Sequence, residues 1–334
     1  MNEFPHARFH RERQAGQCLC LVVGLAMCLV RATLFAAEPP VTALAFAPDG
    51  NVVVAGSQAG LTVYRWPELT RLGMFDTALV SVHDVEFSPD GRTLALGGGT
   101  PSEDGVVELL AWPSGASQGT LTGHEDTVLA VAWNGDSTLA TASLDHEVIV
   151  WDLKIRKPAL RLSGHSKGVT TLCFLDGGKQ LISGGLDNNL RLWDLKAGIA
   201  VRSLNNHTRT IHQLAVRTQT SGLPMVASVS DDQTVRLWQP TIGRMVRFLK
   251  LNSVPLSVVW LPDGSRIAVS CEDGAVRQID PDTAAITDEH PAIDGWAYSL
   301  AVHPLDGSLL AGGQNGKLRR IVVQASSEQK AEGK

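Results

Sequence analysis

One thirteen-residue motif occurs three times along this chain, at intervals of 42 and 45 residues. It reads "TASLDHEVIVWDL" from Thr141, "SGGLDNNLRLWDL" from Ser183 and "SVSDDQTVRLWQP" from Ser228. A second marker is the apolar residue before each turn of the Pro-Asp-Gly type, and successive markers lie 41, 46, 41, 42, 44 and 42 residues apart. The markers are Phe46, Phe87, Trp133, Phe174, Val216, Trp260 and Val302. Seven copies of one unit therefore fill residues 41 to about 323.

Each unit has the pattern of four short strands. "VTALAFAPDG" (41–50) and "VHDVEFSPDG" (82–91) alternate in polarity and then turn, where proline fixes φ and glycine supplies a positive φ. A period of about 40 to 45 residues with four strands is typical of a propeller blade, because such a sheet buries both faces only by stacking on its neighbours around a ring. The sequence predicts an all-β fold, a seven-bladed β-propeller of four-stranded antiparallel blades over residues 38–323.

The first 37 residues have a different character. A basic start with Arg8, Arg11 and Arg13 precedes the apolar run "CLCLVVGLAMCLV" (18–30), and small residues follow up to position 37. This order is typical of a secretory signal peptide. We therefore expect residues 1–37 to be a cleaved signal peptide. An uncleaved membrane anchor is the alternative, although the run is shorter than the roughly 20 residues that span a bilayer.

Charge and cysteine content narrow the expected chemistry. The net charge is −5, or −7 without residues 1–37, and no run of lysine or arginine follows, so nucleic acid is not an expected partner. Beyond residue 37 only Cys173 and Cys271 remain, in different units, and we expect no disulfide between them. Residues 324–334 are polar and are expected to form a disordered tail.

The repeats resemble those of the WD-repeat family of β-propellers over nearly the whole chain after residue 37. The matching stretches are "TGHEDTVLAVAW" with "SLDHEVIVWD", "SGHSKGVTTLCF" with "GLDNNLRLWD", and "NHTRTIHQLAV" with "SDDQTVRLWQ". That family ties each blade together with a His–Ser/Thr–Asp–Trp hydrogen-bond relay. The resemblance implies three relays: His124, Thr141, Asp145 and Trp151; His165, Ser183, Asp187 and Trp193; and His207, Ser228, Asp232 and Trp238.

Recurring serine, histidine and aspartate also invite a catalytic interpretation. Three copies at fixed offsets indicate a scaffold instead, because a catalytic triad is defined by the geometry of one site. A buried tryptophan N–H needs an acceptor, and a hydroxyl between tryptophan and histidine supplies it. We expect no catalytic residue, no metal site and no cofactor.

The outer units depart from the relay pattern. Repeats one and two have Trp66 and Trp112 followed by proline, and repeats six and seven have Ile279 and Ile321 in the tryptophan position. These blades are expected to be held by apolar packing alone. For the closure of the ring two alternatives stand: blade seven has three strands, or "TLFAA" (33–37) stays attached and supplies a fourth.

The family resemblance also implies a binding face. Loops before the first strand and between the second and third strands share one face, which is commonly the binding face. The longest insertion there is "GGGTPSEDG" (97–105). The side chains implied for this partner-binding rim are Lys167, Thr208, Arg209, His212, Asp231, Trp296 and Tyr298.

The roles of one tryptophan and two histidines on that face need separate consideration. Trp296 lies outside a strand and is either an interface anchor or a packing residue between blades seven and one. His83 and His212 each lie four residues before a marker and are expected to line the mouth of the central channel. Two histidines in different blades do not make a metal site.

The function expected is that of a non-catalytic, exported scaffold that binds a protein or peptide on its rim, in the periplasm or outside the cell. Contact with a membrane is expected only if the N-terminal segment is retained. The alternative is an enzyme or cofactor-binding propeller, since "FSPDGRTLALGG" (87–98) also resembles lactonase-like and quinoprotein repeats. Against it, only Asp84 and Glu86 stand out as channel carboxylates, and Glu86 is expected to face a neighbouring blade. By analogy with exported bacterial WD-repeat chains, a sensor module of a larger exported complex is a third possibility.

Overall fold

Short strands joined by tight turns make up nearly all of the described structure. It is a computed structural model that describes residues 38–217 and 222–323. The predicted signal segment (1–37) and the predicted tail (324–334) lie outside these residues. Within them are 27 β-strands, three single-turn 3-10 helices and no α-helix, which confirms the all-β class.

The strands form seven sheets, and in each sheet the strands pair antiparallel in chain order. Blade one is β1 (Ala43–Phe46), β2 (Val52–Ser57), β3 (Gly60–Arg65) and β4 (Thr70–Phe75). Blade two is β5 (Val82–Phe87), β6 (Thr93–Thr100), β7 (Asp104–Ala111) and β8 (Ser117–His124). Blade three is β9 (Val128–Trp133), β10 (Thr138–Ser143), β11 (Glu147–Asp152) and β12 (Lys157–Ser163). Blade four is β13 (Val169–Leu175), β14 (Gln180–Gly185), β15 (Leu190–Asp194) and β16 (Ile199–Leu204). Blade five is β17 (Ile211–Val216), β18 (Val226–Ser230), β19 (Thr234–Gln239) and β20 (Arg244–Lys250). Blade six is β21 (Pro255–Trp260), β22 (Ile267–Cys271), β23 (Ala275–Asp280) and β24 (Ala285–Pro291). Blade seven is β25 (Ser299–Val302), β26 (Leu309–Gly312) and β27 (Leu318–Ile321).

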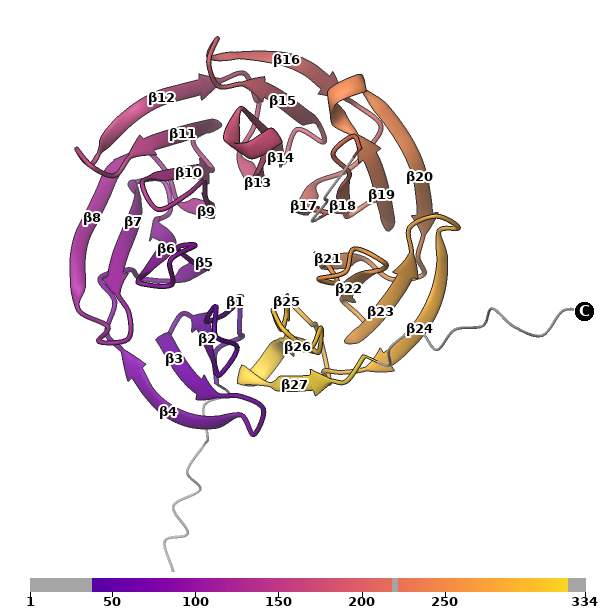
Figure 1. The fold of residues 1–334 in the computed structure, drawn as a ribbon, viewed down its shortest axis with the longest axis horizontal. Coiled ribbons are helices and arrows are strands. Elements are labelled where there is room, and N and C mark those ends of the chain that lie inside the picture. The colour runs from indigo at the N-terminus through magenta and orange to yellow at the C-terminus, as the bar shows by residue number, and fades with distance from the viewer. Residues whose placement is uncertain (1–37, 218–221, 324–334) are drawn as a thin grey trace, which may run out of the picture. The chain divides into compact units, whose positions relative to one another are not determined.

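The seven blades stand around a central axis (Figure 1). The first strand of each blade lines the axis, and each of these inner strands contacts the next, with β25 lying beside β1 to close the ring. This confirms the predicted seven-bladed propeller. Six blades have four strands, whereas blade seven has three among the described residues, and the candidate fourth strand (33–37) lies outside them.

The apolar core lies between the blades, with one cluster at each junction. Six junctions hold nine to twelve buried residues each. The seam between blade seven and blade one holds three, which are Val53, Trp66 and Leu310. Of all the junctions in the described part of the chain, the seam is therefore the least well filled.

The stretch 97–105 is an extended hairpin and not the loop insertion that the sequence suggested. Strands β6 and β7 reach Thr100 and Asp104 and are joined by a three-residue turn. Glycine permits this hairpin, because a Cβ at Gly98 would collide with the Ser81 carbonyl oxygen and one at Gly105 with that of Asp126. The glycine-rich composition therefore reflects close passage of backbone and not an irregular loop.

Candidate functional site: relays, channel and loop face

Three chains of four hydrogen-bonded side chains are centred on blades three, four and five. In each the histidine comes from the segment that leads into the blade, and His124 is the last residue of β8 in blade two. In blade four the Trp193 indole N–H donates to Ser183 Oγ (2.8 Å), Ser183 Oγ lies 2.8 Å from His165 Nε2, and His165 Nδ1 lies 3.0 Å from Asp187. The same links are 2.7–2.9 Å long in the other two relays, through Trp151, Thr141, His124 and Asp145 in blade three and Trp238, Ser228, His207 and Asp232 in blade five.

The ends of each relay have fixed hydrogen-bonding roles. An indole N–H only donates, so the Ser183 oxygen accepts from Trp193, and an ionised Asp187 only accepts, so His165 Nδ1 donates to it. In the neutral imidazole that carries its hydrogen on Nδ1, Nε2 is left to accept from the Ser183 hydroxyl. Each group has a partner, which satisfies the condition under which a buried polar network stabilises a fold.

The relay aspartates are held ionised. Asp187 also accepts from the backbone N–H groups of Ser166 and Asn189. Burial alone raises the pKa of Asp187, but the hydrogen bond from His165 and these N–H groups lower it well below its ordinary value overall. The pKa values of Asp145 and Asp232 are lowered in the same way.

Burial gives the relay hydroxyls a structural role. Thr141, Ser183 and Ser228 have no exposed surface. A nucleophile must reach a substrate, and these oxygens are already bonded on both sides inside the blade. The relays therefore anchor the turns and strands around them.

The tryptophans of repeats one and two do not occupy the relay position, contrary to the sequence interpretation. By strand register, Tyr64 in blade one and Leu110 in blade two take the place that Trp151 has in blade three. Trp66 and Trp112 lie two residues farther along the chain, after β3 and β7. The similarity of Trp-Pro to Trp-Asp concealed this shift of two residues.

The expectation that the outer blades are held by apolar packing alone is wrong for blades two and six. In blade two the buried Glu108 accepts from Thr77 Oγ1 (2.7 Å) and from the Ala78 N–H (2.9 Å). In blade six the buried Arg277 bridges Asp273 (2.6 Å) and Glu289 (3.1 Å). Polar ties of another kind therefore replace the relay in these blades.

The seam between blades seven and one combines aromatic and polar contacts. The Trp66 ring stacks on His303, with 5.5 Å between centroids, and the Arg320 guanidinium lies 5.0 Å from the Trp66 centroid. His303 Nε2 lies 3.0 Å from the Gly50 carbonyl oxygen, and the Val41 N–H donates to a carbonyl of blade seven at 3.0 Å. No sequence pattern indicates this cluster, because its members come from opposite ends of the repeat array.

One face of the ring carries the connections before each inner strand and those between second and third strands, and we call it the loop face. Since strand direction alternates within a blade, these connections emerge on the same side. Lys167 and Arg209 are exposed there, and Asp231 is half-buried. His212, in β17, lies with Nε2 2.6 Å from Asp231 Oδ1. The structure thus brings His212 and Asp231 together, while Lys167 and Arg209 belong to separate blades.

Trp296 and Tyr298 form an aromatic pair on the loop face. Their ring centroids lie 5.7 Å apart, and Trp296 is 44% exposed. The Trp296 backbone N–H donates to Gln314 Oε1 at 3.4 Å, so these contacts are within blade seven. Tyr298 also lines the central channel, which connects the pair to the channel mouth.

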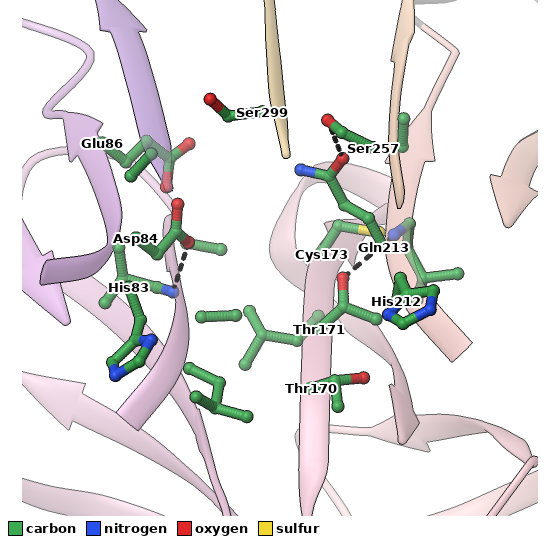
Figure 2. A pocket seen from close by; sticks show the side chains of 18 of the residues that line it. His83, Asp84, Glu86, Thr170, Thr171, Cys173, His212, Gln213, Ser257 and Ser299 are labelled. Carbon is green, nitrogen blue, oxygen red and sulfur yellow. Dashed lines mark hydrogen bonds between the residues drawn. The ribbon is translucent and has the colours of Figure 1, made fainter. Parts of the chain in front are cut away.

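The channel holds a cavity of about 460 Å³ lined by the inner strands. His83 and His212 are among its lining residues, as the sequence predicted. Figure 2 shows Asp84 and Glu86 on one wall, with Thr171 and Gln213 on other strands around the cavity. Most of the exposed lining is polar, so the channel is not a second apolar core.

Polar side chains three residues before the markers tie one inner strand to another. The Leu214 N–H donates to Thr171 Oγ1 (3.0 Å), and the Val258 N–H donates to Gln213 Oε1 (2.7 Å). Five of the seven units have a polar residue at this offset, the exceptions being Ala43 and Ala130. We did not recognise these links from the sequence, although the constant offset was the available signal. The five residues are Asp84, Thr171, Gln213, Ser257 and Ser299.

Asp84 and Glu86 both bond to blade three. The Val131 N–H donates to Asp84 Oδ2 (2.9 Å) and the Trp133 N–H donates to Glu86 Oε2 (3.0 Å), so Glu86 faces a neighbouring blade as expected. Burial raises the pKa of Asp84 to about 6. Burial, together with the charge of Asp84, raises the pKa of Glu86 to about 8. Burial also raises the pKa of the nearby Cys173 thiol, which therefore stays protonated.

Metal, disulfide and membrane features can be assessed for residues 38–217 and 222–323. There, no three His, Cys, Asp or Glu side chains come together as a group that could hold a metal ion. Both cysteines in these ranges are free thiols, as expected. Across the same ranges, no helix has the length and apolar character needed to cross a membrane.

Comparison with known proteins agrees with the repeat architecture. The family described as "WD domain, G-beta repeat" matches residues 30–64, 115–152, 156–194, 198–239 and 245–280, more than half of the chain.

Similar curated proteins include THO complex subunit 3 of Arabidopsis thaliana, 29% identical over 47% of this chain and 38% of that protein. U3 small nucleolar RNA-associated protein 15 of Schizosaccharomyces pombe is 27% identical over 69% of this chain and 46% of that protein. Cell division cycle 20.1, cofactor of APC complex, of Arabidopsis thaliana is 29% identical over 60% and 45%. The matched region spans less than half the length of each of these relatives.

Proposed function

The chain belongs to the WD40-repeat family, and from this we propose that it is a non-catalytic scaffold that binds a protein or an extended peptide on the loop face of its propeller. The names of similar proteins support a role in protein assemblies, since they include a complex subunit and a cofactor of a complex. A propeller is a rigid platform, and its specificity lies in the side chains presented by its loops.

The observation that carries the proposal is an aromatic pair, the exposed Trp296 and the half-buried Tyr298. Large aromatic side chains are the preferred anchors of protein interfaces because they bury much area with few rotatable bonds. Trp296 keeps 44% of its surface exposed, and Tyr298, with which it pairs, lines the channel. The exposed cations Lys167 and Arg209 stand elsewhere on the same face and would read acidic groups of a partner.

We further propose that the protein is exported by its N-terminal segment. The basic start and apolar run of residues 1–37 support this location, with a partner in the periplasm or outside the cell. Fractionation of cells followed by N-terminal sequencing tests the location and the cleavage site together. Recovery from the cytoplasm alone would contradict export.

The test of binding is capture of partners from the envelope fraction by the native chain, with Trp296→Ala beside it. We expect the variant to lose a specific partner at least tenfold, as removal of an aromatic anchor does at about 1.4 kcal/mol or more. Leu305→Ala is the matched control. Leu305 is 74% exposed in the same blade, but it lies in the β25–β26 connection on the opposite face. Equal capture by native chain and Trp296→Ala would overturn the loop-face proposal.

An enzyme or cofactor-binding propeller remains the second candidate, favoured by one feature of the channel. Asp84 and Glu86 are neighbouring carboxylates with raised pKa values on the wall of the cavity. Raised carboxylate pKa values recur at catalytic sites. Elemental analysis and absorption spectra of the purified protein distinguish the two candidates, because stoichiometric Ca²⁺ or quinone would favour this one.

A further inference from the structure

The outer rim of the propeller is unevenly charged. In blades three, four and five the outer strand and the connection that leads into it span residues 153–163, 195–204 and 240–250, and we call these stretches the basic rim. They contain nine lysines and arginines and no aspartate or glutamate, although the whole chain has a net charge of −5. All nine cations are exposed. The corresponding stretch of blade six (281–291) contains three acidic residues and no lysine or arginine.

Four of the nine cations have a structural role. Arg161 and Arg202 donate at 2.9 and 3.1 Å to backbone carbonyl oxygens of blades two and five. Arg156 and Arg247 make the same kind of contact with blades two and six. The other five side chains have no hydrogen bond or ion pair among the described residues; they are Lys154, Lys157, Lys196, Arg244 and Lys250. Unpaired charges of one sign repel each other, so the fold gains nothing from this arrangement.

Apolar side chains are exposed among these cations. Between 44% and 63% of the surface is exposed for Ile155, Ile199, Val201, Ile242 and Phe248. The hydrogen bond from Arg202 to the Thr241 carbonyl oxygen brings β16 against the connection that carries Ile242, so the exposed groups of blades four and five adjoin. Single exposed apolar residues are common, but an apolar patch with a charged border is typical of an interaction site.

The shape and composition of the basic rim indicate the kind of partner. Free cations and exposed apolar groups together are complementary to a partner that offers acidic and apolar side chains. Strands β12, β16 and β20 follow one another along the convex outside of the ring (Figure 1), so a chain that bends can meet all three, whereas a flat bilayer touches a convex rim at one place. Within the basic rim only Phe248 offers an aromatic ring on which a nucleic-acid base could stack.

We propose that the basic rim is a second interaction surface and that it binds an extended acidic segment of another protein, with apolar residues between the acids. The carboxylates of such a segment pair with the five free cations, and its apolar side chains cover the exposed isoleucines. Ile155 and Ile242 lie in connections between third and fourth strands, which emerge on the face opposite the loop face. The proposal therefore goes beyond the binding function of the loop face.

A synthetic probe tests the chemistry of the partner. The probe is a labelled peptide of four Glu-Leu-Gly repeats, and its binding to the full chain is measured by fluorescence anisotropy. We expect peptides with glutamine for glutamate, or with serine for leucine, to bind at least about tenfold more weakly, because each lacks one of the two complementary groups. Raising NaCl from about 0.05 M to 0.5 M should weaken binding of the first peptide, since salt screens exposed charges.

Charge reversal tests the location. Lys196→Glu with Arg244→Glu should weaken binding of the Glu-Leu-Gly peptide at least about tenfold. The matched control is Arg65→Glu with Arg71→Glu, which reverses two exposed cations in blade one and should change the affinity by no more than about twofold.

The apolar contribution is tested in the same assay. Ile155→Ser with Ile242→Ser should weaken binding several-fold, whereas Leu72→Ser with Met74→Ser, on the exposed outer strand of blade one, should not. All four double variants change exposed side chains, and thermal unfolding checks that each is folded.

Several results would overturn the proposal. These are no measurable binding of the Glu-Leu-Gly peptide, equal losses in the rim and blade-one variants, or tighter binding to phosphatidylglycerol vesicles or to single-stranded oligothymidylate. Self-association of the native chain that Lys196→Glu with Arg244→Glu abolishes would identify a second copy as the occupant instead. None of these results bears on partner capture by Trp296, so the two proposals fail separately.

Discussion

Blades four and six solve the same structural problem with different chemistry. At equivalent positions blade four has Ser183, Asp187 and Trp193, whereas blade six has Val269, Asp273 and Ile279. Both keep an arginine four residues after the aspartate, paired to it at 3.3 Å in blade four and 2.6 Å in blade six. The blade therefore depends on strand pairing and on the apolar core. The additional polar network can be a relay, as in blade four, or an arginine bridge, as in blade six.

The largest effect on stability is expected at the position of the relay hydroxyl, which is Ser183 in blade four and Val269 in blade six. Ser183→Ala removes the acceptor of Trp193 and the partner of His165, leaving two buried groups unpaired. We expect the free energy of unfolding to fall by about 2–4 kcal/mol. In blade six, Val269→Thr adds a buried hydroxyl where valine now packs, and we expect a loss of about 1–3 kcal/mol. Loss of the hydroxyl would thus destabilise blade four, and gain of a hydroxyl at the equivalent position would destabilise blade six.

Denaturant unfolding measures both changes, with Ser203→Ala as the control. Ser203 lies on the exposed outer strand of blade four and bonds only to Arg191 at 3.0 Å. If Ser183→Ala were no more destabilising than this control, the relay would contribute nothing to stability.

A smaller effect is expected at the arginine. Arg277→Met removes the bridge to Asp273 and Glu289, but the side chains of both acids are 39% and 52% exposed and become solvated. We therefore expect a loss of about 1 kcal/mol. Raising NaCl to about 1 M should reduce the difference from the native chain, because salt screens partly exposed ion pairs. Arg191→Met is the matched variant in blade four, and a larger loss there would contradict the assignment of the bridge as the main tie of blade six.

The last expected effect is a pH dependence of stability that differs between the relay aspartates and Glu86 on the channel wall. The pKa of Glu86 is raised by burial to about 8, so its contribution to stability is complete below its unfolded value and is lost as the pH rises towards 8. The pKa values of Asp187 and Asp232 are lowered, so the contribution of these two carboxylates to stability is lost as the pH falls. Glu86→Gln keeps an acceptor for the Trp133 N–H and should flatten the alkaline decline only.

Thermal unfolding from pH 3 to pH 9 measures this difference. Glu103→Gln, an exposed change in the β6–β7 turn of the same blade, is the control and should leave both limbs unchanged. A Glu86→Gln profile that follows the native one through pH 8 would show that the carboxyl is not held protonated.

The features that repeat along the chain could be predicted from the sequence, whereas those that occur once could not. The marker spacing predicted seven blades, because each hairpin must return the chain to the same radius of the ring. The fixed offsets from Thr141 to Trp151 and from Ser183 to Trp193 placed the relay members together, since both residues of each pair lie on adjacent strands of one hairpin.

Other features depend on contacts that no local pattern encodes. Tyr64, and not Trp66, is the blade-one equivalent of Trp151. The sequence does not show this, because turn lengths vary between repeats by as much as the two residues that separate Tyr64 from Trp66. The stacking of Trp66 on His303 joins the first and last blades, and neither residue has a counterpart to compare with. Similarly, Arg277 became recognisable as a bridge only when register placed Glu289 opposite it.

The small core at the seam has a consequence for how the ring comes apart. In a closed ring every blade is supported on both sides, and opening any junction leaves an open stack with two end blades. We expect the junction with three buried residues to open before those with nine or more, and blades one and seven to be the first that a protease cuts. The relay blades, several junctions away from that opening, would survive as the most durable fragment.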